Sequence, residues 1–342
     1  MEEVVNDSLG EKWTIVQNRM RAFERSFKQA KIPLDEWCLY DLLPNQFLLS
    51  YYDVKNQITE HIFDNYDKPE IYDHLVNIHK LSKKVHARPL NIDKKYLREV
   101  YFDGGKKLLG KVNAGKTRIE YDPFSTKTGR LTVTPESFPI LTLPKRLRSV
   151  LRPTNDLFVE IDYNSAEIRT MLALAGHEQP PGDIHEWNRR NVWNDEIDRD
   201  EAKRRMFSWL FSSKTNDALQ DVYKPNEVVP KYWDGKVIET PFGRVIESDD
   251  FHALNYLVQS TNSDLFLECV CKVDELLSNG TDSHVAFTIH DSVVLDMSKK
   301  DLDKLGECIT LMKNTRLGVF MTNVKIGLTF GNLVEKPNSG LK

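Results

Sequence analysis

Two aspartates lie within apolar, strand-like sequence. Asp162 lies near the end of the stretch LFVEIDYN (157–164), in which apolar residues alternate, and Asp291 lies in AFTIHDSVVLDM (286–297) between two apolar runs. Burying an unpaired carboxylate costs several kcal/mol, so the pattern indicates a compensating cation. Two aspartates on adjacent strands suit two divalent ions roughly 3.5–4 Å apart, and Mg²⁺ prefers such oxygen ligands. The alternative is that both residues are caps or turn residues at strand ends.

A second pattern repeats every four residues in DRDEAKRRMFSWLF (198–211). Its members are Arg199, Lys203, Phe207 and Phe211, which share one helix face that drifts by about 40° per step. Arginine and lysine bind phosphate oxygens and an aromatic ring supports a sugar and base, so this face suits a nucleoside triphosphate. As an isolated pattern it equally describes an amphipathic helix with its aromatic residues in the core.

The elements that must position these residues are an α+β set. Apolar spacing predicts helices within 12–85 and at 165–176, 198–211, 253–277 and 301–314. Strands are predicted at 157–164, on both sides of His290-Asp291 as a tight hairpin, within 237–247 around a Pro-Phe-Gly turn, and at 324–331. Residues 86–130 read as loops with short elements, and the sequence shows no internal repeat.

Composition limits the class of protein. The 342 residues are 40% hydrophobic and 29% charged, which is ordinary for a globular chain of two or three domains. No apolar run reaches 18 residues and the first residues are acidic, so neither a membrane span nor a secretory signal is expected. Four cysteines without zinc spacing favour a reducing, cytoplasmic compartment. Net charge is −4, but basic residues cluster at 80–84, 145–152 and 203–205.

The motifs between about Lys127 and Asn332 resemble, in order, those of the family A DNA polymerases, the group of bacterial DNA polymerase I and many phage replicases. The matching segments are TKTGRLTVTPESFPILTLP, DYNSAEIR (162–169), DIH (183–185), RDEAKRRMFSWLFS (199–212), TPFGR (240–244), NYLVQSTNSD (255–264), IHDS (289–292) and TRLGVFMTNVKIG (315–327). The resemblance implies a right-hand α+β fold with an antiparallel palm sheet, helical fingers and a reduced N-terminal or thumb region. The expected parts are 1–126 for the N-terminal region, 127–175 and 251–342 for the palm, and 176–250 for the fingers.

The resemblance also implies roles for individual residues. Two Mg²⁺ ions, replaceable by Mn²⁺, would be held by Asp162, Asp291 and the Tyr163 carbonyl. Glu167 would be the steric gate against ribose, and Lys203 would assist catalysis. The incoming dNTP would contact His185, Arg199, Lys203, Phe207 and Phe211. Primer-template DNA would contact Arg130, Asn255, Gln259 and His290, and the basic pair Lys145 and Arg146 is expected to bind it as well.

Three positions depart from the family pattern. Phe211-Ser212 stands where Tyr-Gly is usual, Ser292 replaces a peripheral glutamate, and Ala166 replaces a bulkier residue. The chain is too short for the usual proofreading exonuclease domain. A short thumb predicts low processivity unless a partner, such as a processivity factor, clamps the DNA. A separate exonuclease or helicase chain is a further expected partner, and a virus or mobile element the expected source.

Three alternative functions remain open from the sequence. A single-subunit RNA polymerase shares the palm, but Glu167 and Phe207 favour deoxyribonucleotides. A non-catalytic DNA-binding subunit with a polymerase fold has no physical need for paired acids. A two-metal nuclease would leave the Arg199–Phe211 helix face unused.

Overall fold

The computed structural model describes residues 7–32, 34, 37–211 and 217–336, without the side chains of Phe211 and Asp217. Contacts divide the chain into two compact units, Met1–Pro69 and Glu70–Lys342. No helix among the described residues is long and apolar enough to cross a membrane.

The first unit is helical, as its apolar spacing predicts. It contains α1 (Asp7–Gln29), α2 (Leu39–Leu42) and α3 (Asn45–Asn65). The helices α1 and α3 bury two small apolar clusters, one around Met20, Phe27 and Phe47 and the other around Val16, Val54 and Ile58. The rings of Phe23 and Phe47 lie 5.1 Å apart between the two helices. This unit therefore has a core of its own.

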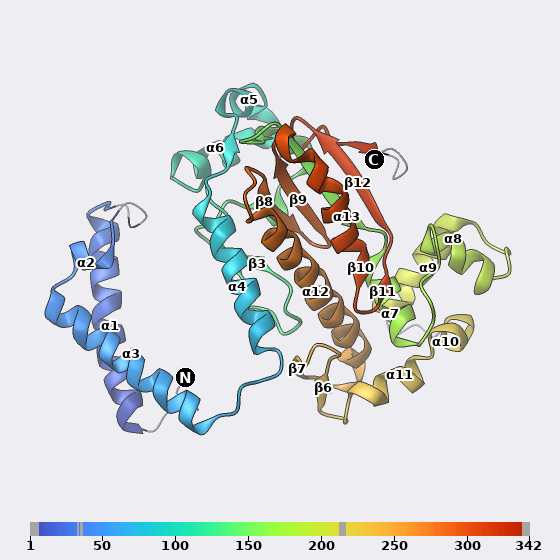
Figure 1. Ribbon diagram of the computed structural model, residues 1–342, viewed down its shortest axis with the longest axis horizontal. Helices are drawn as coiled ribbons and strands as arrows, with labels where there is room; N and C mark the ends of the chain where they lie inside the picture. The colour runs from blue at the N-terminus through green and yellow to red at the C-terminus, as the bar shows by residue number, and fades with distance from the viewer. Residues whose placement is uncertain (1–6, 33, 35–36, 212–216, 337–342) are drawn as a thin grey trace. The chain divides into compact units, whose positions relative to one another are not determined.

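The second unit is built on a five-stranded antiparallel sheet with strand order β13-β12-β5-β9-β8. Its strands are β5 (Leu157–Tyr163), β8 (His284–Ile289), β9 (Ser292–Met297), β12 (Thr322–Gly327) and β13 (Val334–Lys336). The long helix α12 (Asp250–Leu277) and helix α13 (Leu305–Lys313) lie side by side across the sheet (Figure 1). Alternate residues such as Val159, Ile161 and Val293 are fully buried in the core that includes both helices.

A second apolar cluster lies around the helices that follow β5. These helices are α7 (Ala166–Leu174), α8 (Ile184–Asn191), α9 (Arg199–Phe211), α10 (Asp217–Tyr223) and α11 (Pro225–Tyr232). Met206 and Tyr223 are completely buried in it, and Ala253 and Leu257 extend it onto the first turns of α12. The helical region thus packs on the same α12 that covers the sheet.

Short elements complete the unit. Helix α4 (Tyr72–Ala87) packs along α12, and α5 (Lys94–Glu99) and α6 (Lys106–Asn113) are joined by the π-helical turn η1 (Tyr101–Gly105). Two-stranded ladders pair β1 (Asn91–Ile92) with β4 (Leu151–Arg152), β2 (Tyr121–Asp122) with β3 (Thr132–Val133), β6 (Val237–Glu239) with β7 (Val245–Glu247), and β10 (Asn314–Thr315) with β11 (Gly318–Val319). The 3-10 turns are η2 (Ile140–Thr142), η3 (Lys145–Val150) and η4 (Lys299–Lys304).

Most predicted elements are confirmed, and the differences have local causes. The α+β class, the β8–β9 hairpin and the β6–β7 hairpin are as predicted. Helix α12 begins three residues earlier than predicted because Asp249 caps it, accepting a hydrogen bond from the His252 amide. The last predicted strand, 324–331, is wrong at its end: β12 stops at Gly327, against which the Asn332 carbonyl packs as the chain turns back. Helices α8, α10 and α11 lie within 176–250, the part expected to be helical, but apolar spacing did not predict them individually.

Candidate active site

The structure places Asp162 and Asp291 on adjacent antiparallel strands. Asp162 is opposite Ser292 in the β5–β9 ladder, and the Tyr163 amide donates to the Asp291 carbonyl at 3.3 Å. Asp291 follows His290, which forms the tip of the hairpin with a left-handed φ of 52°. The tight turn and the strand register together bring the two carboxylates to one end of the sheet.

Both carboxylates have raised pKa values. Burial raises the pKa of Asp162 to about 7, helped by Glu160 and Asp291 and opposed by Lys325. Burial also raises the pKa of Asp291, although Arg130 and a 3.0 Å hydrogen bond from the Asn262 amide oppose the change. Burial therefore makes the ionised forms of both carboxylates unfavourable, which is the condition a divalent cation relieves.

The donor set fits Mg²⁺. Carboxylate oxygens are its preferred ligands, and it is usually held by one or two carboxylates together with water and substrate phosphates. In the described part of the chain no group of three or more His, Cys, Asp or Glu side chains could hold a metal ion. Asp162 and Asp291 are the carboxylates that could hold a cation here, and their role as its ligands stays a prediction.

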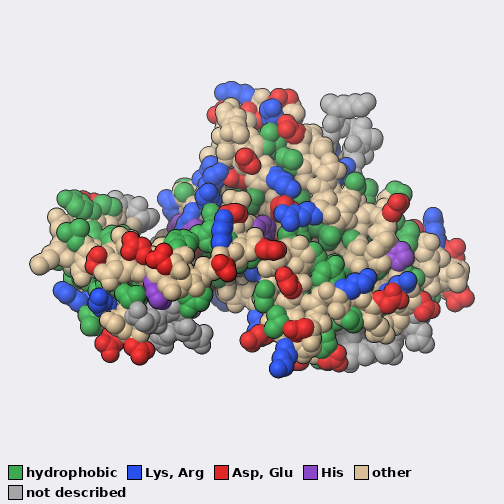
Figure 2. All heavy atoms as spheres, turned by 60° about the horizontal axis from the view of Figure 1, so that its bottom comes forward, with side chains coloured by type: hydrophobic (Ala, Val, Ile, Leu, Met, Phe, Trp, Pro, Cys, Tyr) green, Lys and Arg blue, Asp and Glu red, His purple; other side chains and the backbone are tan. Residues whose placement is uncertain are grey.

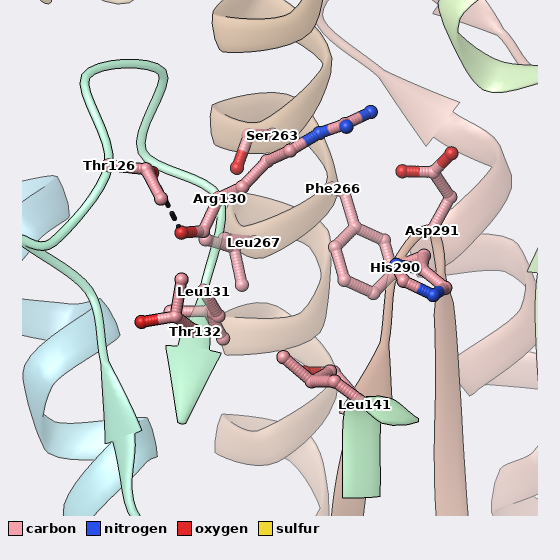
Figure 3. A pocket seen from close by; sticks show the side chains of 11 residues that line it. Thr126, Arg130, Leu131, Thr132, Leu141, Ser263, Phe266, Leu267, His290 and Asp291 are labelled. Carbon is pink, nitrogen blue, oxygen red and sulfur yellow. Dashed lines mark hydrogen bonds between the residues drawn. The ribbon is translucent and has the colours of Figure 1, made fainter. Parts of the chain in front are cut away.

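Next to Asp291 lies a pocket of about 230 Å³, lined among others by Arg130, Ser263, Phe266 and His290 (Figure 3). The Arg130 guanidinium forms an ion pair with Glu167, whose pKa is raised to about 7 by burial despite that partner. The sequence prediction assigned these two residues separate roles and did not anticipate their pairing.

The loop that carries Arg130 is held by side-chain hydrogen bonds from Thr126 and Ser263, among others. Thr126 Oγ1 donates to the Arg130 carbonyl at 2.9 Å, and Ser263 Oγ of α12 donates to the Gly129 carbonyl at 3.0 Å. Gly129 has a φ of 73°, and a Cβ atom there would lie 2.6 Å from the Arg244 guanidinium. Only glycine fits this position, which explains the Thr-Gly-Arg sequence in physical terms.

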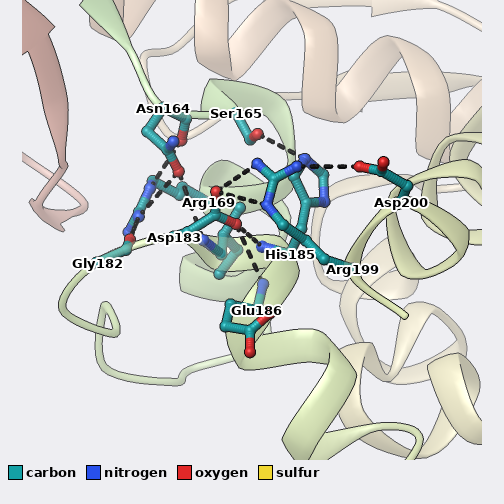
Figure 4. A network of polar contacts seen from close by, with 10 residues as sticks. Asn164, Ser165, Arg169, Gly182, Asp183, His185, Glu186, Arg199 and Asp200 are labelled. Atoms are coloured by element: carbon teal, nitrogen blue, oxygen red, sulfur yellow. Dashed lines mark hydrogen bonds and ion pairs between the residues drawn. The ribbon is translucent and has the colours of Figure 1, made fainter. Parts of the chain in front are cut away.

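A second cluster surrounds the start of α8 (Figure 4). Asp183 caps this helix, accepting from the amides of His185 at 2.7 Å and Glu186 at 3.1 Å, and it also pairs with the Arg199 guanidinium. His185 Nε2 lies 2.9 Å from Ser165 Oγ, and the His185 and Phe207 rings are 5.9 Å apart. His185, Arg199 and Phe207, predicted to bind one ligand, are therefore neighbours.

His185 has the most constrained ring of this cluster. Burial lowers its pKa to about 4, with Arg199 and Lys203 acting in the same direction and Asp183 against it. Its Nδ1 atom is buried and has no hydrogen-bond partner among the described residues. A neutral imidazole with a buried, unsatisfied nitrogen is unusual and marks His185 as a candidate functional residue, although only 2% of it is exposed in this structure.

The two clusters are joined by the turn from β5 into α7. Ser165 occupies this turn with a left-handed φ of 54°. Arg169, completely buried, donates to the carbonyls of Asn164 at 2.8 Å, Pro180 at 3.1 Å and Gly182 at 2.5 Å. It therefore ties the loop before Asp183 to the strand that carries Asp162.

The other predicted DNA contacts are placed as follows. Asn255 and Gln259 are half-buried on α12, four residues apart and in line with Ser263 of the pocket. Lys145 and Arg146 are exposed on η3, where Tyr96 Oη donates to the Arg146 carbonyl at 3.4 Å, and they do not line the pocket beside Asp291. Phe211 ends α9, and its side chain lies outside the described residues.

Basic clusters seen in the sequence are partly neutralised. Arg204 and Arg205 both pair with Glu201 on the same helix, and Lys84 pairs with Asp274. Figure 2 shows Lys and Arg side chains interspersed with Asp and Glu on the face in view. Lys203 is exposed on α9 and, unlike Arg204 and Arg205, does not pair with Glu201, so it is the member of the 203–205 cluster best placed to bind a ligand.

Sequence reasoning missed Asn262, Ser165, Asp183 and Arg169 as site residues. Only Asp183 carried a usable signal: an aspartate three residues before Glu186, which is typical of a helix N-terminus. The others depend on contacts between segments far apart in the sequence.

An antiparallel sheet that presents two aspartates beside a cationic helix face defines a polymerase-type fold, and comparison with known proteins agrees. No family model matches the chain. The chain is 23% identical over 216 residues to a DNA polymerase of Mycobacterium phage D29, covering 52% of this chain and 35% of the phage protein. It thus spans about a third of that relative's length.

The fold is similar to that of the POL domain of Pol1 from M. smegmatis, solved in complex with DNA primer-template and dNTP. The TM-score is 0.58 at 13% sequence identity, covering 84% of this chain and 75% of that chain. The resemblance to DNA polymerase I-like proteins that the motifs predict is therefore confirmed, and so is the α+β polymerase fold.

Proposed function

We propose that this chain is a template-directed DNA polymerase that adds dNTPs to a primer 3′ end. The observation that carries the proposal is the convergence of Asp162 and Asp291 on adjacent strands, connected through Ser165 to the His185–Arg199 cluster. The similarity to a phage DNA polymerase supports the same activity.

The residues divide the work of phosphoryl transfer, which demands in-line positioning and charge neutralisation. Asp162, Asp291 and the Tyr163 carbonyl would hold two Mg²⁺ ions, which when bound activate the primer 3′-hydroxyl and stabilise the departing pyrophosphate. Arg199, Lys203 and His185 bind the triphosphate, while Phe207 supports the sugar and Glu167 excludes a 2′-hydroxyl. Arg130, Asn255, Gln259 and His290 contact the base pair at the primer end through the minor groove, whose acceptors are alike in every pair.

The deoxyribonucleotide preference distinguishes this proposal from an RNA polymerase. Glu167 is 8% exposed and held by Arg130, so its carboxylate is fixed in the site. A non-catalytic DNA-binding subunit is disfavoured because the raised pKa values of Asp162 and Asp291 record an electrostatic cost that packing alone does not require.

Extension of a primed template with Mg²⁺ and dNTPs tests the activity. The Asp291→Asn and Asp162→Asn chains are expected to lose nucleotide addition by at least about 1,000-fold, as expected when a charge-stabilising group is removed, while retaining DNA binding. Asp303→Asn, at an exposed position on η4, is the matched control. Extension by the Asp291→Asn chain at the normal rate would reject metal catalysis through this residue.

We further propose a setting in phage DNA replication in the host cytoplasm, with a processivity factor as partner. Cys38, Cys269, Cys271 and Cys308 are free thiols, which supports a reducing compartment. Similarity to the D29 polymerase supports the phage origin. The lack of proofreading and the assistance of a separate exonuclease or helicase chain stay predictions.

A further inference from the structure

Strand β5 contains a buried carboxylate to which the proposed reaction assigns no role. Glu160 is two residues before Asp162, so the two side chains lie on the same face of the strand, about 7 Å apart along it. Only 8% of Glu160 is exposed. A buried acid so close to a metal-binding aspartate adds charge repulsion to the site and needs a reason.

Both neighbouring strands contact this carboxylate. Lys325 of β12, directly opposite in the ladder, places Nζ 3.1 Å from Glu160 Oε2. Ser292 of β9 places Oγ 3.4 Å from Glu160 Oε1 and 3.2 Å from the Ile289 carbonyl, and its single proton serves one acceptor at a time. One carboxylate oxygen is therefore bound by a cation, and the other is only weakly held.

Ser292 connects Glu160 with the catalytic aspartates. It follows Asp291 directly and lies opposite Asp162 in the β5–β9 register. A serine at this position contributes no charge to the site. The additional negative charge near the two aspartates on this face of the sheet belongs to Glu160, whose carboxylate Ser292 contacts.

We propose that Glu160 is a positioning residue that strengthens divalent cation binding at Asp162 and Asp291, and that Lys325 sets the strength of this effect. The inference rests on the proposed function. Glu160 acts through its charge and not as a ligand, since the described residues offer no group of three acids able to coordinate one ion. If the ion is as far from Glu160 as the Asp162 side chain is, about 7 Å, Coulomb's law at the dielectric constant of water gives a change in affinity on the order of five- to tenfold for a unit charge.

Replacing each member of this ion pair in turn gives a test, because the direction of the change in cation affinity distinguishes an electrostatic role from a purely structural one. If Glu160 and Lys325 merely stabilise the sheet, replacing either one affects the protein in the same direction. If their charges act on the cation, Glu160→Gln weakens binding several-fold and Lys325→Gln strengthens it. The measurement is titration of the full chain with Mn²⁺, followed by electron paramagnetic resonance, with circular dichroism to compare folding.

Restoring the charge from the neighbouring strand gives an independent variant. Ser292→Glu in the Glu160→Gln chain is expected to return Mn²⁺ affinity to within about twofold of the original, and Ser292→Glu alone to increase it. Unchanged affinity in Glu160→Gln and Lys325→Gln, or weakening in both, would overturn the inference. If the Glu160→Gln or Lys325→Gln chain fails to fold, the Ser292→Glu chain tests the inference by itself. Unchanged or weaker Mn²⁺ binding by that chain would also contradict the inference.

The outcome is separable from that of the proposed function. If Mn²⁺ binding depends on Asp291 but not on Glu160 or Lys325, only the role of Glu160 is wrong. If the chain neither binds Mn²⁺ through Asp162 and Asp291 nor extends a primer, the polymerase proposal fails and this inference fails with it.

Discussion

At the scale of single residues, the site is defined by carboxylates that are buried without full compensation. Asp162 and Glu167 both have pKa values raised to about 7, and in both cases burial is the largest cause. Neighbouring acids contribute to these raised pKa values, Glu160 and Asp291 for Asp162 and Asp291 for Glu167. Burial therefore leaves the Asp162 carboxyl partly protonated near neutral pH, and a bound cation would favour its ionised form.

Glu167 provides the sharpest residue-scale prediction. It is buried at the start of α7, and its carboxylate pairs with Arg130 beside the pocket. Because its bulk is proposed to exclude a 2′-hydroxyl, Glu167→Ala should reduce the preference for dNTPs over rNTPs by on the order of 100-fold. The ratio of kcat/KM values for a dNTP and its matching rNTP measures the effect.

Glu167→Gln is the control for this prediction. It keeps the volume of the side chain but removes the charge that binds Arg130. If the volume of the side chain excludes the 2′-hydroxyl, the Glu167→Gln chain retains the preference for dNTPs. If the pairing with Arg130 is required, the Glu167→Gln chain loses this preference, as the Glu167→Ala chain does. An unchanged preference in Glu167→Ala would remove the steric role altogether.

At the scale of elements, alternation and helical spacing predicted the parts that bury a simple apolar face. In β5 the apolar residues Val159, Ile161 and Tyr163 alternate with Glu160 and Asp162, and α12 carries a long apolar pattern, so both were predicted with nearly correct bounds. Helix α8 was missed because its sequence, IHEWNRRN, contains few apolar residues, and α11 because it contains Pro230. These helices are stabilised by their place in a tertiary cluster rather than by their local sequence.

The same distinction applies to the site. Asp162, Asp291 and the α9 face could be predicted because their spacing follows the period of a strand or a helix. Asn262 and Arg169 could not, since Asn262 reaches Asp291 across 29 residues of chain and Arg169 binds carbonyls of an irregular loop. Such contacts exist only after folding, and one sequence gives no periodic signal for them.

A buried ion pair joins three elements and leads to a stability prediction. Asp264 of α12 accepts from Arg244 Nη2 at 2.7 Å and Nε at 2.8 Å and lies 3.2 Å from His74 Nε2 of α4. Asp264→Asn leaves the Arg244 charge poorly compensated and should lower the free energy of unfolding by about 3–5 kcal/mol. Denaturant unfolding measures it, with Asp303→Asn as the exposed control.

The pH dependence of this pair follows from the lowered pKa of Asp264. Burial acts to raise the pKa, but hydrogen bonds from Arg244 and His74 outweigh it. A carboxylate whose pKa is lowered by folding stabilises the fold fully at pH values above its pKa in the unfolded state, about 4. This stabilisation is lost as the pH falls through its pKa in the folded state. The stability difference between the original and Asp264→Asn chains should therefore be constant above about pH 5 and shrink below about pH 4. A difference that stays constant down to about pH 2 would show that ionisation of Asp264 does not stabilise the fold.

At the scale of the whole molecule, the proposed binding of DNA would depend on few elements. Between β1 and β2 the chain forms only α5, η1 and α6, of six, five and eight residues. If this short segment serves as the thumb, few phosphate contacts hold the duplex, and we expect low processivity. Primer extension with an excess of trap DNA measures nucleotides added per encounter, and hundreds added by the lone chain would contradict the prediction.

The same segment supplies the last prediction. Residues 94–111 contain six basic residues, Lys94, Lys95, Arg98, Lys106, Lys107 and Lys111, against two acidic ones, Glu99 and Asp103. None of the six forms an ion pair with a residue in the described ranges, whereas Lys300 pairs with Asp282 and Lys304 with Glu307. A surface with net positive charge and no ion-pair partners among the described residues favours phosphate binding despite the negative charge of the whole chain.

Replacing Lys106, Lys107 and Lys111 by alanine should weaken binding of primer-template DNA and flatten its salt dependence. For duplex DNA, removing one lysine–phosphate interaction lowers the slope of log K against log salt by about 0.9, so the slope of the triple variant should fall by up to about 2.7. Fluorescence anisotropy at several salt concentrations measures this slope. Replacement of Lys299, Lys300 and Lys304 on η4, whose charges are paired, is the matched control and should leave the slope unchanged. An equal decrease in both triple variants would show that only total charge matters, and the α5–α6 segment would then have no specific part in holding DNA.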